Sequence, residues 1–189
     1  MHISRSLRGL GLAVAAVGFV CAVQSAAAQT GGETFTATAT FKGQSRPVTI
    51  QITRQIAAAD RDKLATLLKA GDSAGLHKAL ASMPDLGYLE VGGVKTPIKY
   101  AFARPTGSGR MVTVVTAKAL AHLGSAGPDA KPKEGYDFAL ALLVLNGADT
   151  GDGELTAATQ LKLNESGAFV TDKYEGETIR LTGVTKKSS

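Results

Sequence analysis

The stretch GDSAG, residues 71–75, has the Gly-x-Ser-x-Gly pattern in which serine hydrolases present their nucleophile. In those enzymes a strand enters the turn and a helix leaves it, which lifts the serine oxygen beside an oxyanion hole. Here a helical pattern enters the turn. Gly71 is then explained as the residue that ends this helix, and Asp72 or Ser73 as the N-cap of the next. We therefore interpret GDSAG as a helix connector and keep a serine hydrolase using Ser73 as the alternative.

A general base for Ser73 is hard to supply. His77 lies four residues further along the same helix, and His122 lies at the end of a strand, where Asp85 or Asp172 could in principle orient it. A zinc site needs three or four ligands at workable spacing, commonly with carboxylates or thiolates beside histidines, so metal binding through His77 or His122 is kept only as an alternative. We accordingly predict no catalytic residue, no cofactor and no metal ligand.

A second acidic stretch, NGADTGDGELT at 146–156, carries Asp149, Asp152 and Glu154 as oxygen donors. Calcium loops need such donors at alternate positions with a bidentate Glu, and this spacing does not fit. A phosphate cradle needs a following Lys and a helix start, and negative charge opposes it. The stretch predicts a hairpin turn, with weak cation binding as the alternative.

Residues 1–28 read as an export signal. Arg5 and Arg8 precede an apolar stretch from Leu10 to Val23, and the small residues before Gln29 suit cleavage near Ala28. This stretch is shorter than the roughly 20 residues that span a bilayer. The prediction is an exported protein, periplasmic or extracellular, with no transmembrane segment in residues 29–189.

The amino-acid composition argues against disulfides, thiolate chemistry and a nucleic-acid partner. The single cysteine, Cys21, lies in the predicted signal, so residues 29–189 have no disulfide and no thiolate. Without the signal the formal net charge falls from +5 to +3, and the basic residues are scattered. There is no Trp and there are only four Tyr, so we expect no nucleic-acid partner.

The chain pattern predicts strands before and after two short helices. TFTATATF (34–41) and RPVTIQITR (46–54) alternate at period two and form a hairpin. Period 3.6 follows from Asp60, a plausible N-cap, to Gly71, and again over 76–83 before Pro84.

Strand patterns return from Leu86. They comprise LGYLEV, TPIKYAFARP, GRMVTVVTAKAL and FALALLVL, and the last stretches, ELTAATQLKL, GAFVTDKY and TIRLTGV, predict two or three further strands. FALALLVL, 138–145, is continuously apolar and is predicted to be a central strand that is buried on both faces. The stretch 124–135, rich in Gly, Pro and charge, predicts a long flexible loop.

This order predicts a single α+β domain over 29–189: a mainly antiparallel sheet or partly open barrel of about eight strands, with a short helical hairpin inserted after the first two strands. Length supports this, since about 160 residues can bury one sizeable core.

The same order of elements resembles a family of exported bacterial proteins of uncharacterised function. The resemblance rests on VTIQITR, DRDKLATLLKAG, PIKYAFARP, GRMVTVVTAKAL, YDFALALLVLN, GDGELTAATQLKL and YEGETIRLTGV. The resemblance implies that the chain is exported and shares the fold of this family, and it implies no activity.

By elimination we expect a non-enzymatic domain that binds a protein partner, or a small apolar molecule held between sheet and helical hairpin. The alternatives are the Ser73 hydrolase and a structural, envelope-associated protein.

Overall fold

A computed structural model describes residues 32–120, 123 and 133–187 of the chain. The elements are, in chain order, β1 (Glu33–Phe41), β2 (Gln44–Ile52), α1 (Ala58–Lys69), α2 (Ser73–Ser82), β3 (Gly87–Val91), β4 (Val94–Thr106), β5 (Gly109–Thr116), β6 (Phe138–Asn146), β7 (Thr150–Leu163) and β8 (Phe169–Lys186). The predicted signal and most of the predicted loop at 124–135 lie outside the described residues.

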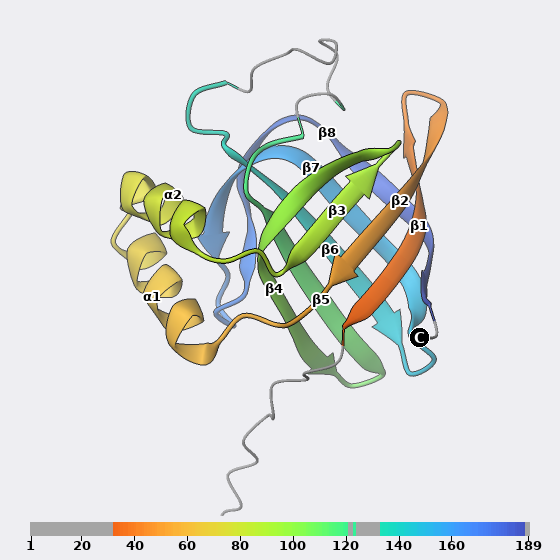
Figure 1. Cartoon of the computed structure of the whole chain (residues 1–189), viewed down its shortest axis with the longest axis horizontal. Coiled ribbons are helices and arrows are strands. Elements are labelled where there is room, and N and C mark those ends of the chain that lie inside the picture. The colour runs from red at the N-terminus through yellow and green to blue at the C-terminus, as the bar shows by residue number, and fades with distance from the viewer. Residues whose placement is uncertain (1–31, 121–122, 124–132, 188–189) are drawn as a thin grey trace, which may run out of the picture.

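The eight strands form a closed antiparallel barrel in sequence order, and β8 returns to pair with β1 (Figure 1). Closure satisfies the backbone groups that an open sheet would leave at its edges. The predicted α+β class, the strand number and the place of the helical hairpin are confirmed.

The barrel interior is filled by alternate side chains of each strand, as period two requires. Cross-strand register places Ile50 opposite both Phe35 and Leu89, for example. The largest buried side chains of this interior are Phe35, Ile50, Leu89, Ile98, Leu143, Leu145 and Leu155. The interior is therefore a packed core and not a channel.

A shift of register in β4 changes which side chains face outward. Ile98 pairs with Thr116, but Tyr100 pairs with Val115, so one extra residue is inserted between them. Beyond this bulge the interior positions of β4 are Ala101 and Ala103. Tyr100 and the alternate residues after it are consequently turned to the outer wall.

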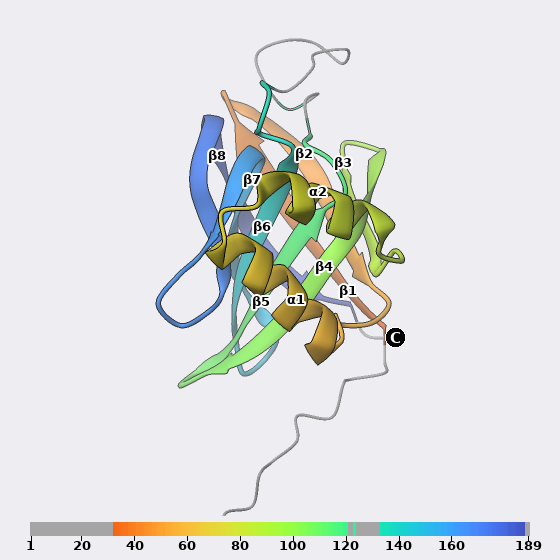
Figure 2. The ribbon, with the colours of Figure 1, turned by 90° about the vertical axis from the view of Figure 1, so that its left-hand side faces the viewer.

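The helical hairpin packs against that outer wall, where α1 contacts β7 and α2 contacts β4 (Figure 2). Its buried residues Leu64, Leu76 and Leu80 belong to the same hydrophobic core as Tyr100 and Phe169. The Tyr100 and Phe169 rings lie 4.3 Å apart between centroids. The core thus extends through the barrel wall to the inner face of the helices.

Two local predictions need correction, and of the two or three predicted closing strands the structure has two. Helix α1 begins at Ala58 after Ala57, with no side-chain cap, and Asp60 lies in its first turn, where a carboxylate favours the positive end of the helix dipole. GAFVTDKY and TIRLTGV form one long strand, β8, whose register shifts take up the glycine at 176. Strand β6 is buried on both faces only in its first half, because the helices do not cover Val144, which is 55% exposed.

We predict that Leu80→Ala lowers the free energy of unfolding by about 2–5 kcal/mol, because it opens a cavity between α2 and the barrel wall. Urea denaturation measures this difference. The control is Val144→Ala on the exposed part of the wall, which should change stability by no more than about 0.5 kcal/mol. Equal losses in the two variants would contradict a shared core beneath α2.

Candidate functional site

The GDSAG segment is a helix connector in the structure. Gly71 has a φ of +68°, which suits the residue after a helix, and the Asp72 carboxylate accepts a hydrogen bond from the Gly75 amide at 2.8 Å. A side chain at position 75 would overlap the Asp72 carboxylate. Both glycines and the aspartate are therefore explained by capping, and the N-cap is Asp72.

Ser73 has no catalytic surroundings in the described part of the chain. It is the exposed first residue of α2, and no hydrogen bond joins it to His77. The exposed His77 instead lies against Phe138, with 5.7 Å between ring centroids. His122 lies outside the described residues.

The two carboxylates considered as partners for His122 are both paired with lysines. Asp85 lies 2.8 Å from Lys99 Nζ, and Asp172 lies 3.1 Å from Lys162 Nζ. Neither aspartate shares a cluster with Ser73.

The acidic stretch after β6 is the predicted hairpin turn. The Asn146 side chain accepts hydrogen bonds from the amides of Ala148 and Thr150, which stabilises the turn. Within the described ranges, no group of three or more His, Cys, Asp or Glu side chains is placed to hold a metal ion. The turn also supplies one carboxylate, that of Asp149, to a charge cluster that the sequence pattern did not indicate.

This charge cluster consists of Glu33, Arg110, Asp149 and Lys186 at one mouth of the barrel. Arg110 lies 2.9 Å from Glu33 and 2.8 Å from Asp149, and Lys186 lies 2.9 Å from Glu33 and 3.4 Å from Asp149. The hydrogen bond to Glu33 raises the pKa of Lys186. Two cations and two anions balance, so the cluster ties β1, β5, β8 and the β6–β7 turn together without a net charge.

The charge cluster forms one side of a hollow of about 800 Å³, which we call the mouth hollow. Its other side is formed by the chain segment that leads into α1 and by the end of β4, including Ile56, Ala57, Phe102 and Pro105. The second side thus combines apolar residues with the polar side chains of Gln55, Arg61 and Arg104.

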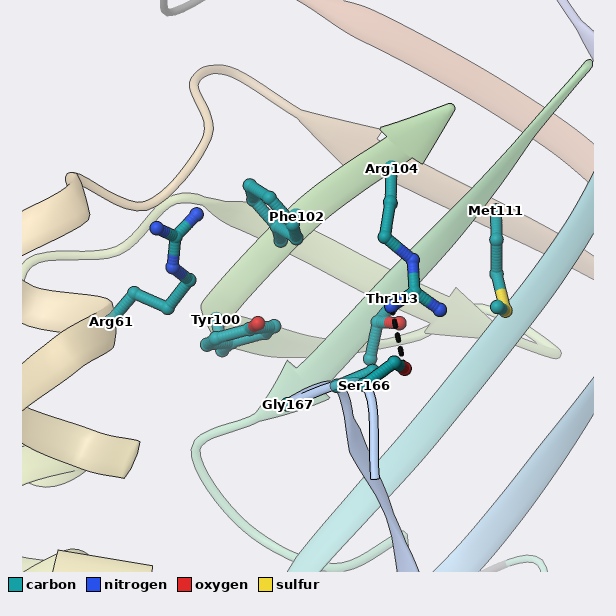
Figure 3. A pocket seen from close by; sticks show the side chains of 9 residues that line it. Arg61, Tyr100, Phe102, Arg104, Met111, Thr113, Ser166 and Gly167 are labelled. Atoms are coloured by element: carbon teal, nitrogen blue, oxygen red, sulfur yellow. Dashed lines mark hydrogen bonds between the residues drawn. The ribbon is translucent and has the colours of Figure 1, made fainter. Parts of the chain in front are cut away.

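A second hollow, the wall pocket, has a volume of about 290 Å³ and lies between α1, the outer face of β4–β5 and the β7–β8 turn (Figure 3). It is lined by Arg61, Tyr100, Phe102, Arg104, Met111, Thr113, Ser166, Gly167 and Ala168. Arg61, Phe102 and Arg104 line both hollows, which are therefore neighbours.

Two arginines give the wall pocket a positive charge. The Arg61 guanidinium lies over the Phe102 ring, 4.7 Å from its centroid. Arg104 donates a hydrogen bond to the Ser166 hydroxyl at 2.7 Å. No Asp or Glu is among the nine residues that line this pocket.

Tyr100 forms part of the pocket wall and is 1% exposed. Burial raises the pKa of Tyr100 to about 12, against the opposing effect of the two arginines. At neutral pH its hydroxyl is therefore a protonated hydrogen-bond donor. Together these groups can bind and orient an anionic or polar group beside an apolar one.

The wall pocket was missed because its residues are far apart in the sequence. The alternation of Tyr100, Phe102 and Arg104 is visible in PIKYAFARP, and an arginine at the end of a mostly apolar face is a weak signal of a site. The β-bulge that turns this face toward α1 has no recognisable pattern in the sequence.

Neither helix in the described ranges has the length and apolar character needed to cross a lipid bilayer. Comparison with known proteins finds no matching family model, no match among curated proteins and no match among solved structures. The resemblance to exported bacterial proteins therefore stays a prediction.

We predict that Asp72→Ala lowers the free energy of unfolding by about 0.5–2 kcal/mol, as expected for loss of an N-cap. Ser73→Ala, the adjacent control, should change it by no more than about 0.5 kcal/mol. Thermal or urea denaturation measures both. A larger loss for Ser73→Ala would contradict the assignment of Asp72 as the cap.

We also predict alkaline destabilisation that depends on Tyr100. Its pKa is 10.0 in the unfolded chain and about 12 in the folded one, so its contribution to stability is complete below pH 10 and is lost as the pH rises through 12. A difference of about two pH units corresponds to at most about 3 kcal/mol.

The measurement is urea denaturation between neutral pH and pH 12 for the parent chain, Tyr100→Phe and the control Tyr174→Phe. Tyr100→Phe should lose less stability on alkalinisation than the other two chains, because it lacks the hydroxyl whose ionisation destabilises the fold. Lys186 is present in all three chains, so its titration does not cause a difference between them. If the stability of all three chains falls equally between neutral pH and pH 12, the predicted contribution of Tyr100 is contradicted.

Proposed function

We propose that the chain is an exported, non-enzymatic binding domain that holds a small, largely apolar molecule in the wall pocket and mouth hollow beneath α1. The observation that carries this proposal is the pair of neighbouring hollows at the junction of barrel and helices. Ligand pockets have volumes of about 300–1,000 Å³; the mouth hollow, at about 800 Å³, lies within this range and the wall pocket, at about 290 Å³, lies at its lower limit.

The construction of the two hollows supports binding. The floor is the outer face of β4 and β5, two long strands of a closed barrel, and α1 with the segment before it forms the rim. Phe102 and Met111 offer apolar surface, and the guanidinium groups beside them offer fixed donors. Ligand sites commonly combine a mostly apolar lining with a few convergent polar groups.

The competing functions have less support in the geometry. Ser73, the nucleophile of the hydrolase alternative, lines neither hollow. For a protein partner or an envelope-associated structural role, the exposed part of β6 offers Val144 in a separate hollow of about 480 Å³, whose charged residues Asp152, Glu154 and Arg180 include both signs. Export rests on residues 1–28 and is part of the proposal.

A direct test uses residues 29–189 and the neutral apolar dye N-phenylnaphthylamine, whose fluorescence rises in apolar surroundings. We expect saturable binding to the parent chain. Met111→Trp should weaken it about tenfold or more, because the indole would fill the wall pocket.

The matched control is Val144→Trp. Val144 pairs with Met111 across β5 and β6 on the same outer face but lines neither hollow. It should leave dye affinity within about twofold. Absence of saturable dye binding by the parent chain, or an equal loss of dye affinity in both variants, would contradict the proposal.

A further inference from the structure

We infer that the ligand carries an acidic group, and that the wall pocket binds this group between Arg61 and Arg104 while the apolar part extends toward the mouth hollow. The ligand class is a small apolar acid with one negative charge. This inference rests on the proposed function and deepens it.

The first argument is the charge of the wall pocket. In the mouth hollow, Arg110 and Lys186 are each matched by Glu33 and Asp149 at 2.8–3.4 Å. In the wall pocket the lining includes two guanidinium groups and no carboxylate. Because Arg61 and Arg104 line both hollows, the positive charge that no lining carboxylate balances lies where the two hollows meet.

Nearby acids do not remove this imbalance. Asp62 lies 3.8 Å from Arg61 Nε, but its side chain is 75% exposed, and exposed pairs of this length contribute little. Arg104 is held by the neutral Ser166 hydroxyl, not by an acid. Both guanidinium groups keep donors for an anion.

The second argument is the Tyr100 hydroxyl. Tyr100 is buried, lines the pocket, and makes no side-chain hydrogen bond with the described residues. The hydroxyl oxygen is not enclosed by protein, so it is open to a group that enters the hollow. An oxygen of a bound acid would accept this hydrogen bond.

The third argument is that the pocket is organised before a ligand arrives. The Ser166 hydroxyl accepts from Arg104 and donates to Asn164, and Asn164 also accepts from the backbone amides of Ser166 and Ala168. The β7–β8 turn thus holds Arg104 in place, as the hydrogen bond in Figure 3 shows. Fixed donors lower the cost of ordering side chains on binding.

The apolar surroundings specify the rest of the ligand. The Phe102 ring and the Met111 side chain lie beside the arginines, and the shared residues lead to Ile56 and Pro105 of the mouth hollow. A highly charged ligand would gain nothing from these surfaces. An acid with an apolar body uses both parts of the site.

The experiment compares two dyes that share one apolar body: N-phenylnaphthylamine and anilinonaphthalene sulfonate, which adds one negative charge. We expect the sulfonate to bind the parent chain about tenfold more tightly at low salt, with the advantage falling as salt rises. Decanoate should likewise displace either dye at a lower concentration than decanol.

Arg104→Gln and Arg61→Gln should each remove most of the affinity advantage of the sulfonate over the neutral dye, which is a ratio of about tenfold in the parent chain. Urea denaturation of both variants checks that the fold is intact. Arg104→Lys should restore part of the advantage. Arg180→Gln is the control, because Arg180 is 72% exposed and lines neither hollow.

The outcomes separate the two proposals. Equal binding of both dyes, or a sulfonate advantage that Arg104→Gln leaves intact, overturns the acidic ligand while the binding function stands. Failure of both dyes to bind overturns both.

Discussion

The bulge in β4 sets the direction of every side chain that forms the wall pocket. Without the extra residue between Ile98 and Tyr100, strict alternation would turn Tyr100, Phe102 and Arg104 into the barrel, where Ala101 and Ala103 now face. Two bulky aromatic rings and a guanidinium cannot replace two alanines in a filled interior. The bulge therefore permits a closed, packed barrel and an outward binding face on the same strand.

Closure of the barrel and placement of the helices depend on each other through this arrangement. The outward Tyr100 ring meets Phe169 and completes the core beneath the helical hairpin. At the mouth, the cluster around Arg110 is balanced in charge and joins strands that are distant in sequence.

The sequence predicted much of the fold and little of the site. Alternation in TFTATATF and the leucine spacing after Asp60 are local patterns, and local patterns are sufficient to identify strands and helices. Closure is not local: it depends on pairing between β1 and β8, whose residues Ala39 and Leu181 are far apart in the chain. Arg61 and Arg104 likewise lie in one pocket only because the fold brings α1 against β4. Their spacing in the sequence gives no indication of this.

The motif and the pocket differ in how fully their polar groups are satisfied. In GDSAG the positive φ of Gly71 and the Asp72–Gly75 hydrogen bond account for the two glycines and the aspartate as parts of a helix connector. The motif therefore gives no reason to assign a catalytic role. In the wall pocket, Arg61 and Arg104 have no carboxylate among the lining residues, and the Tyr100 side chain makes no hydrogen bond with the described residues. These donors are open to the hollow and are available to a bound group. The physical case for function therefore lies with Arg61, Tyr100 and Arg104, which no sequence motif marks.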